Sequence, residues 1–439
     1  MTRADGGASS ANGTNSGLPP SDGGVCPASS TLCGSGKSAA CTVLENDPMN
    51  CGVCGRTCVP GISCVAGACQ QRKCTGPVSF RKIASHPHAL IPKEPTSGYM
   101  AADMNRDGRL DLLEYDGNDG TRELVIWLGR DDGTFAISTS YPTVGAFSTP
   151  ALPGYAAVGD FNEDGLADLV VANLEDSSAV TIRPGLPGGG LGGHPGIPLR
   201  RSLMADLDGD GHLDVVTTVH SDNGKDPTRI LVLRGRGNGT FASPRSNTVS
   251  DLAGVAALQD WDGDGVLDIL AQGSVLHILY GKGDGNFADD QRCAIGPAGS
   301  AFVFFTDLNQ DGKLDVLWSM WPDKRLGTVF GQGGCSFTPT TGYPFSVQPQ
   351  IFTLGDLDGD GLVDLLVTED PADPLTGSGS TTALLTGSSD GRFARQPDLA
   401  VDSSNLDNVF IADVNGDGRA DLVCTGTRGI EVYANTCVQ

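Results

Sequence analysis

The sequence predicts an all-β protein whose main part is a seven-bladed β-propeller, each blade being a four-stranded antiparallel sheet. One acidic pattern recurs seven times along the 439 residues, at intervals of 46 to 57 residues. Each copy is followed by short apolar, β-branched runs, which indicate buried strands. The 62 glycines and 26 prolines favour turns over long helices. Repeats of this length that each supply one small sheet are typical of propellers.

The repeated pattern is D-x-[DN]-x-D-G-x-x-D. Oxygens at positions 1, 3 and 5 converge on one point, and the glycine permits a sharp turn. A main-chain carbonyl at position 7 and a carboxylate at position 9 complete an oxygen shell of the kind that Ca²⁺ prefers. We therefore expect up to seven Ca²⁺ ions. The expected ligands, loop by loop, are Asp103, Asn105, Asp107, Arg109, Asp111; Asp160, Asn162, Asp164, Leu166, Asp168; Asp206, Asp208, Asp210, His212, Asp214; Asp260, Asp262, Asp264, Val266, Asp268; Asp307, Asn309, Asp311, Lys313, Asp315; Asp356, Asp358, Asp360, Leu362, Asp364; and Asp413, Asn415, Asp417, Arg419, Asp421.

Other readings of this pattern fit less well. Clusters of Asp, Asn and Gly also make ordinary turns, but turns alone predict scattered acids rather than the same positions filled seven times. Glu114 stands where an EF-hand places its last ligand, whereas the other six copies have no acid there. Dockerin and thrombospondin calcium loops recur at much shorter intervals. The pattern therefore favours one calcium loop per blade.

Four strands are expected per blade: one before the loop, one after it, a second apolar run such as Ile230–Leu233, and a strand that begins at a phenylalanine after a Gly-rich turn. The chain ends after Ile430–Tyr433, where the seventh blade still lacks its fourth strand. Phe80 lies as far before the first loop as the other phenylalanines lie before theirs. We expect the strand near residues 79–85 to fill that gap and close the ring, which removes an open edge.

Residues 77–439 resemble the FG-GAP/VCBS-type calcium repeats, whose relatives include the integrin α-subunit head and some fungal lectins. The resemblance implies a calcium-binding propeller that recognises ligands at cell surfaces. We take residues 75–439 as the propeller domain. The expected function is a non-enzymatic, calcium-stabilised binding module for adhesion or ligand recognition.

Nine of the 13 cysteines fall within residues 26–74, a density typical of a disulfide-stapled module. Only one CxxC pair, Cys51 and Cys54, is present there, whereas a zinc ribbon needs two. The stretch from Asn50 to Cys69 resembles Cys-rich modules of bacterial surface and secreted proteins. Residues 1–25 read as a disordered linker without an apolar signal segment. An extracellular or cell-surface location follows, for example as a lipoprotein whose signal is absent from this chain.

The four remaining cysteines lie in the propeller. Cys437 is at the chain end that must meet Cys74, so we expect a Cys74–Cys437 bridge. Cys293 and Cys335 then form the other pair, and Cys424 in a buried strand is the odd thiol. Spacing alone leaves other pairings open.

The net charge of −24 opposes nucleic acid or an anionic membrane surface as partner. No apolar run is long enough for a transmembrane segment, and no catalytic motif is found. We expect a monomer that binds a protein or glycan ligand on the rim opposite the calcium loops, where long connections lie. Those connections are 116–122, 220–228, 319–327 and 369–381. A lectin, suggested by Trp318 and Trp321 beside one of them, is the alternative, and a polysaccharide-acting enzyme is the third possibility.

Overall fold

The computed structural model describes most of the predicted propeller and short parts of the segment before it. The described residues are 31–33, 40–42, 64–65, 68–69, 72–88, 98–105, 107–115, 123–142, 154–172, 180–192, 199–219, 229–249, 252–273, 275–288, 290–295, 300–320, 325–339, 342–344, 348–370, 381–402, 408–426 and 428–438. The linker predicted over residues 1–25 lies outside them, as does most of the predicted Cys-rich module. The described parts of that module are residues 72–74 and two short antiparallel pairs: β1 (Thr31–Cys33) with β2 (Ala40–Thr42), and β3 (Cys64–Val65) with β4 (Ala68–Cys69).

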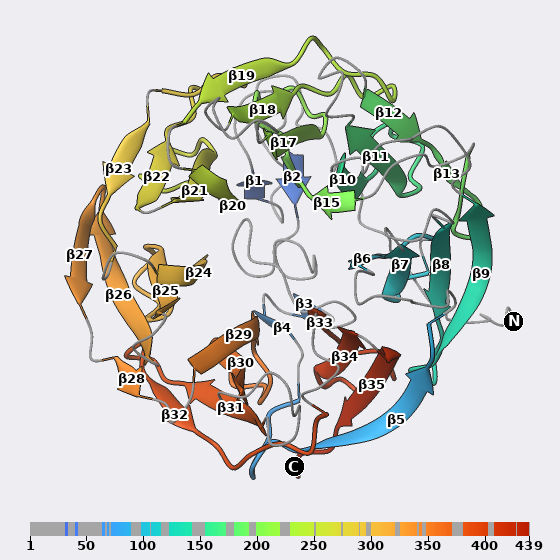
Figure 1. Cartoon of the computed structure of the whole chain (residues 1–439), viewed down its shortest axis with the longest axis vertical. Helices are drawn as coiled ribbons and strands as arrows, with labels where there is room; N and C mark the ends of the chain where they lie inside the picture. Colours follow the sequence, from blue (N-terminus) through green and yellow to red (C-terminus); the bar gives the residue numbers. More distant parts are fainter. Residues whose placement is uncertain are drawn as a thin grey trace, which may run out of the picture.

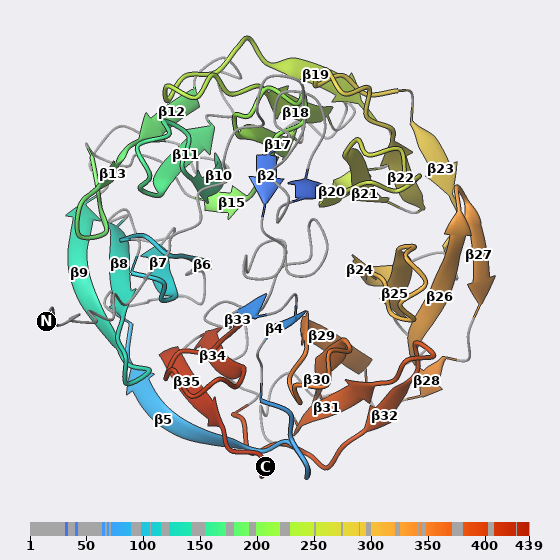
Figure 2. The same cartoon turned by 180° about the vertical axis from the view of Figure 1, so that it is seen from behind.

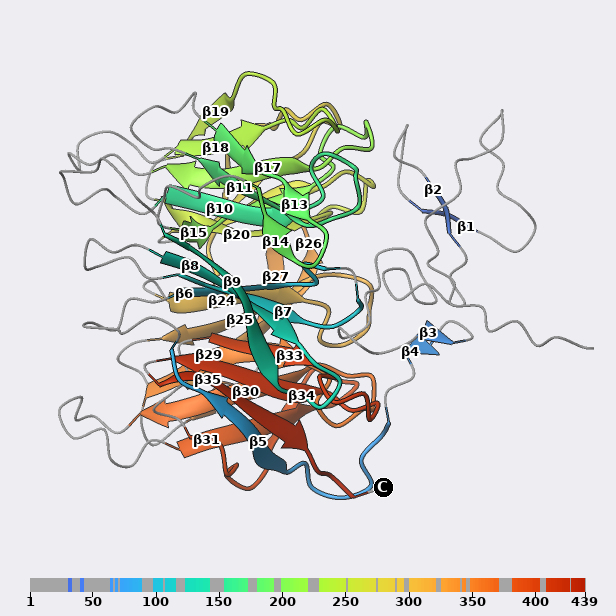
Figure 3. The same cartoon turned by 90° about the vertical axis from the view of Figure 1, so that its right-hand side faces the viewer.

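Seven sheets form a closed ring (Figure 1), and their strands run from one face of the ring to the other (Figure 3). We number the blades by their acidic loops. The strands, blade by blade, are β6 (Gly98–Ala102), β7 (Asp111–Tyr115), β8 (Glu123–Gly129), β9 (Phe135–Pro142); β10 (Gly154–Gly159), β11 (Asp168–Ala172), β12 (Val180–Arg183), β15 (Leu199–Arg201); β16 (Leu203–Ala205), β17 (Asp214–Val219), β18 (Arg229–Leu233), β19 (Arg245–Thr248); β20 (Leu252–Gln259), β21 (Asp268–Gly273), β22 (Leu276–Leu279), β23 (Gln291–Cys293); β24 (Ser300–Thr306), β25 (Asp315–Met320), β26 (Arg325–Gly333), β27 (Ser336–Pro339), β28 (Tyr343–Pro344); β29 (Gln348–Gly355), β30 (Asp364–Asp370), β31 (Thr381–Gly387), β32 (Phe393–Arg395); and β33 (Asn408–Ala412), β34 (Asp421–Gly426), β35 (Gly429–Asn435), β5 (Phe80–His86). The predicted all-β, seven-bladed propeller is confirmed.

Blade two departs from the expected pattern in its fourth strand. Its sheet has the order β12-β11-β10-β15, so β15 pairs in parallel with the innermost strand instead of antiparallel with the third. Where the other blades turn into a fourth strand, this blade has a short hairpin of β13 (Gly185–Leu186) and β14 (Gly190–Leu191). The turn of this blade is Gly-rich, but Leu191 follows it where most other blades have phenylalanine.

The core of the ring lies between neighbouring blades. Side chains of a strand alternate between its two faces, so successive residues of each second strand pack on different neighbours: Val316 faces blade four and Leu317 faces blade six. Among the described residues, seven apolar clusters fill the seven interfaces. The cluster with Leu112, Val125, Val423 and Val432 joins the first blade to the last, so the ring has no end.

The ring is closed by an N-terminal strand, as predicted. Strand β5 pairs antiparallel with β35, with Phe80 opposite Asn435 and His86 opposite Ile430. Figures 1 and 2 both show β5 on the outside of β35, although the two strands lie at opposite ends of the propeller sequence. Just beyond these strands the Cys74–Cys437 disulfide joins the two segments, with Cα atoms 5.6 Å apart.

The other two predictions about propeller cysteines are also confirmed. Cys293, at the end of β23 in blade four, pairs with Cys335, in the turn between β26 and β27 of blade five. Cys424 is a free, buried thiol on β34. Burial raises the pKa of this thiol, because a thiolate would lose its solvation there. The described part of the chain contains no helix that could span a membrane.

Candidate metal centres

Each acidic loop joins the first strand of a blade to the second. The first strands of all blades run in the same direction, so all seven loops lie on one face of the ring. Loop one shows how the turn is held. Asp103 accepts the backbone N–H groups of Asp107 (3.1 Å) and Gly108 (2.8 Å), and Asn105 accepts that of Asp107 at 3.0 Å. These bonds wrap the loop around the side-chain oxygens of positions 1, 3 and 5 and hold them on its inner side.

The aspartate at position 9 begins the second strand and is exposed by no more than 1% in any loop. In blade one, its Oδ2 accepts the backbone N–H of Met104 and its Oδ1 that of Gly129, both at 2.8 Å. The same two bonds recur in the other six blades, at 2.7 to 3.2 Å. This carboxylate therefore ties the loop to the end of the third strand. The nine-residue pattern did not reveal this structural role, because the partner lies outside it. Its role as a metal ligand stays a prediction.

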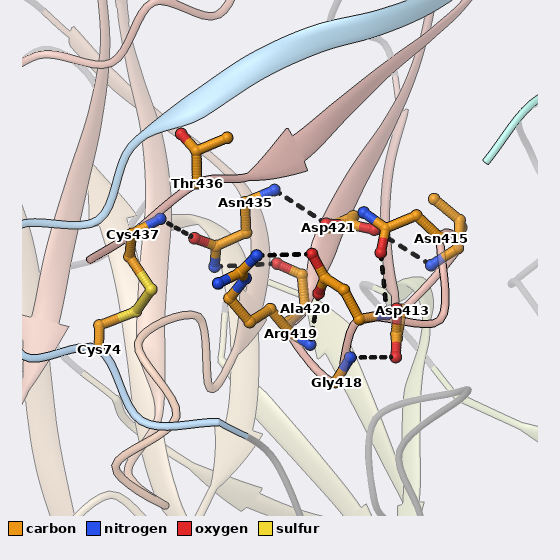
Figure 4. Close-up of polar contacts among 12 residues, drawn as sticks. Cys74, Asp413, Asn415, Gly418, Arg419, Ala420, Asp421, Asn435, Thr436 and Cys437 are labelled. Atoms are coloured by element: carbon orange, nitrogen blue, oxygen red, sulfur yellow. Dashed lines mark hydrogen bonds and ion pairs between the residues drawn. A yellow bond between two sulfur atoms is a disulfide. The ribbon is translucent and has the colours of Figure 1, made fainter. Parts of the chain in front are cut away.

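The residue that donates to Oδ1 is glycine in six blades. A Cβ at Gly235 would lie 2.1 Å from the carbonyl oxygen of Leu213, and the equivalent glycines are as tightly placed. Blade seven has Asn435 instead. Its side-chain amide donates to the carbonyl of Ala420 in its own loop at 3.1 Å (Figure 4). The same amide donates to the carbonyl of Leu357 in loop six at 2.8 Å. Asn435 therefore links two neighbouring loops.

Position 4 of the loop adopts a left-handed backbone, which glycine tolerates best. Among the six loops in which this position is described, it is glycine in four, whereas Glu163 and Gln310 occupy it in loops two and five, each with φ of 59°. Both side chains reach the next loop. Glu163 contacts His212 and raises the pKa of that imidazole, and Gln310 donates to the carbonyl of Gly361 at 3.3 Å. Sequence reasoning missed these residues because the pattern leaves position 4 open.

Three of the described loops bring three carboxylates within 4.8 Å of one another: Asp206, Asp208 and Asp210; Asp260, Asp262 and Asp268; and Asp356, Asp358 and Asp360. These are the loops with aspartate rather than asparagine at position 3. In loop three, Oδ1 of Asp208 is buried and lacks a hydrogen-bond partner among the described residues. An orphaned carboxylate oxygen beside two further carboxylates fits a hard divalent cation.

A model of the FG-GAP-like repeat matches residues 103–171, 206–271, 260–318 and 356–424, more than half of the chain. The chain belongs to the FG-GAP-like repeat family. Each matched stretch begins at the first acid of one loop and contains the next loop, so all seven acidic loops lie within the matches. The predicted resemblance to FG-GAP repeats is confirmed.

No curated protein has a significantly similar sequence, but the chain is similar to several solved structures. A crystal structure of BBS1N in complex with ARL6DN is 13% identical, covers 82% of this chain and 97% of its own, and has a TM-score of 0.50. The Tc holotoxin pore of Photorhabdus luminescens is 16% identical over 74% of this chain, which spans only 15% of the toxin chain, at a TM-score of 0.39. A protein of unknown function from Desulfotomaculum acetoxidans is 13% identical, with coverage of 72% and 92% and a TM-score of 0.43.

Burial raises the pKa of the position-9 carboxylates in this FG-GAP propeller. The pKa is about 6 for Asp111 and Asp268, and about 7 for Asp214, Asp364 and Asp421. Loss of solvation is the largest cause, and the other acids of the loop add to it, although the two backbone N–H groups act in the opposite direction. A bound cation would reverse this balance by favouring the charged form.

Loop three allows the structural role of position 9 to be tested without metal. Asp214→Ala would leave the buried N–H groups of Leu207 and Gly235 unpaired, whereas Asp210 is exposed and only caps its own turn. We expect Asp214→Ala to lower the free energy of unfolding by about 3 kcal/mol and Asp210→Ala by less than about 1 kcal/mol. Urea denaturation in the presence of a chelator measures both. Equal effects would mean that position 9 contributes only through metal.

Proposed function

We propose that this FG-GAP propeller is a calcium-stabilised, non-enzymatic module that binds a protein or glycan ligand outside the cell. The observation that carries the proposal is the set of seven acidic loops on one face of a closed ring. An all-oxygen set of carboxylates, amides and carbonyls suits Ca²⁺ better than softer metals, and a loop of flexible turns suits Ca²⁺ better than Mg²⁺. Calcium would also offset much of the net charge of −24.

An oxidising compartment is supported by the two propeller disulfides. Cys74–Cys437 and Cys293–Cys335 each join separate parts of the ring, and structural disulfides of this kind persist in secreted and surface proteins. The nine cysteines of residues 26–74 support the same location.

We place the ligand site on the rim opposite the calcium loops. The residues 116–122, 220–228, 321–324 and 371–380, which make up most of the long connections there, lie outside the described residues. The proposal therefore rests on topology, since connections after the second strand of each blade all emerge on that rim.

The non-enzymatic part of the proposal is supported by where the histidine–carboxylate pairs lie. His277 and Asp290 are 2.9 Å apart, and His88 and Glu114 are 2.7 Å apart, but both imidazoles are almost fully buried within the ring. The third pair among the described residues, His212 and Glu163, is exposed, but it joins two neighbouring acidic loops. Glu114, the acid that mimics an EF-hand ligand, also accepts the indole N–H of Trp127 at 2.8 Å. The His88–Glu114 pair joins the last blade to the first, and the His277–Asp290 pair lies within blade four. Both buried pairs are therefore explained as structural contacts.

A lectin is the second candidate, and Trp318 bears on it. The ring of Trp318 lies against Gly327 of the neighbouring strand, where a Cβ would be 2.2 Å from the indole. Its Nε1 is buried. This placement favours packing within blade five over stacking on a sugar. Trp321 lies outside the described residues.

Calcium titration followed by a glycan array tests the proposal. We expect isothermal titration of the metal-free protein to show several Ca²⁺ ions bound per chain, up to seven, because seven loops repeat the ligand pattern. The calcium-loaded protein is then applied to the array. Binding to a defined glycan would establish the lectin function, and a silent array would favour a protein ligand. Absence of calcium binding would contradict the proposal.

A further inference from the structure

The blades of the ring interlock through their turns. In blades one, two, three, four and six, a glycine in the turn after the third strand packs against position 3 of the preceding blade's loop. A Cβ at Gly239 would lie 3.6 Å from that of Asn162, and one at Gly391 would lie 3.3 Å from that of Asn309. In blade five, the carbonyl of Gly334 instead accepts the indole N–H of Trp261 in loop four, at 3.0 Å. Loops one to five and loop seven are thus each covered by a turn of the next blade.

Blade seven has no such turn, because its fourth strand, β5, comes from the N-terminal side. The segment Arg72–Cys74 takes the place of the turn. The backbone N–H of Cys74 donates to the carbonyl of Asp358 at 2.7 Å, and that of Arg72 to the carbonyl of Gly418 at 2.8 Å. The ammonium of Lys73 lies 3.9 Å from the carboxylate of Asp360. One short segment therefore contacts both loop six and loop seven.

This segment changes the surroundings of the two loops. The position-5 acid is exposed in loops one to five, but Asp360 and Asp417 are only partly exposed. The backbone approaches so closely that a Cβ at Gly359 would lie 2.5 Å from the carbonyl oxygen of Arg72. The close approach of Arg72 is thus a reason for glycine at position 4 of loop six beside its left-handed backbone, and loop three, which has the same Asp-Leu-Asp-Gly-Asp-Gly sequence, serves as the comparison.

We propose that calcium in loops six and seven controls the attachment of the N-terminal segment to the propeller, through the contacts of Arg72–Cys74. This inference rests on the proposed calcium binding. A filled loop is rigid and presents the carbonyls of Asp358 and Gly418 as acceptors. An empty loop holds several carboxylates that repel one another, so it opens and loses those two hydrogen bonds. Because residues 1–71 precede this segment in the chain, the metal content of the two loops would control how the N-terminal part of the protein is attached.

The attachment is reciprocal, because two binding events that stabilise each other do so equally. Calcium tightens the contact of Arg72–Cys74, and that contact raises the calcium affinity of loops six and seven but not of loops one to five. The Cys74–Cys437 disulfide keeps the segment near the loops in both states.

Trypsin measures the contact directly, because Arg72 and Lys73 are both cleavage sites. The comparison is between Asp356→Asn and Asp206→Asn, the same position in two loops that share their first six residues, both as full-length protein in excess Ca²⁺. We expect cleavage at Arg72 and Lys73 to be about fivefold faster in Asp356→Asn, the effect of losing the one hydrogen bond of ordinary net strength that Cys74 donates to Asp358 in loop six. Asp206→Asn should match the wild type. Equal rates in the two variants would overturn the inference.

A second pair of variants leaves every proposed metal-ligand residue unchanged. Gly359→Ala displaces Arg72, whereas Gly209→Ala places the same strain in loop three, where φ is also left-handed (78° and 70°). We expect faster cleavage only in Gly359→Ala, and the same rate in both would again overturn the inference. Calcium titration of Asp356→Asn and Asp206→Asn tells a failure of the proposed calcium binding from a failure of the proposed attachment. Each variant should bind one ion fewer than the wild type. If neither loses an ion, the proposed calcium loops are wrong. If each does and cleavage is still equal, only the attachment is wrong.

Discussion

Replacing Cys74 and Cys437 with alanine is expected to lower the free energy of unfolding by about 4 kcal/mol, within the range measured for native disulfides. The bridge spans 363 residues, so it removes more conformational freedom from the unfolded chain than a short bridge does. It also stands where the other blades have a covalent turn between the third and fourth strands. Without it, β5 is held to β35 by backbone hydrogen bonds and packing alone.

The expected loss of protection is confined to blades one and seven, where the two ends of the propeller sequence meet. When β5 detaches, backbone groups of β35 lose their partners, and the cluster that joins Val125 to Val432 across blades one and seven is opened. Hydrogen exchange should therefore rise in β6, β34 and β35 together, although these strands are far apart in sequence. Deleting residues 75–90 should produce the same pattern more strongly.

The Cys293–Cys335 bridge serves as the matched control. It spans only 42 residues and joins neighbouring blades four and five. Its replacement by alanine should raise exchange in those blades and leave β5 and β35 protected. If the Cys74 and Cys437 variant showed increased exchange only near the N-terminus, the ring would not depend on this closure.

The closure itself was predictable from the sequence, for a physical reason. Strand periodicity and the acidic pattern give each blade a fixed internal spacing, so the missing strand after Tyr433 and the extra strand at Phe80 could be matched by counting residues. The disulfide pairs followed because a closed ring brings Cys74 and Cys437 together. In a regular repeat protein, contacts between residues far apart in the sequence can be predicted from the spacing within each repeat.

What the sequence did not reveal are contacts between units rather than within one. Asn435 reads as an ordinary strand end, yet its amide joins loops six and seven. Glu163 occupies a position that the repeat leaves free, and its contact with His212 depends on where the next blade lies. The parallel pairing of β15 in blade two has no local signal at all. Such features depend on the distance between blades, which no single repeat encodes.

Removing calcium is expected to lower the melting temperature by about 10 °C or more. A ligand at a hundredfold its dissociation constant stabilises the folded state by about 2.7 kcal/mol per site. The three loops with three clustered carboxylates alone would then contribute about 8 kcal/mol, and a domain of this size shifts its melting temperature by little more than about 1 °C per kcal/mol. Calorimetry with calcium and after chelation measures the change. An unchanged melting temperature, in a protein shown by elemental analysis to be metal-free, would contradict calcium stabilisation.

The stability of the metal-free protein and the stabilisation that calcium adds should change with pH in opposite directions. The pKa of Asp214, Asp364 and Asp421 rises from 3.8 to about 7 on folding of the metal-free chain. Between these values the folded form holds more protons than the unfolded one, so the metal-free protein becomes less stable as pH rises from about 4 to 7. Calcium binds only the ionised carboxylates, so its stabilisation grows over the same window. The melting temperature should be higher at pH 5.5 than at pH 7.5 in chelator, and the increment that calcium adds should be larger at pH 7.5. An increment independent of pH would mean that the buried carboxylates do not take part in binding the metal.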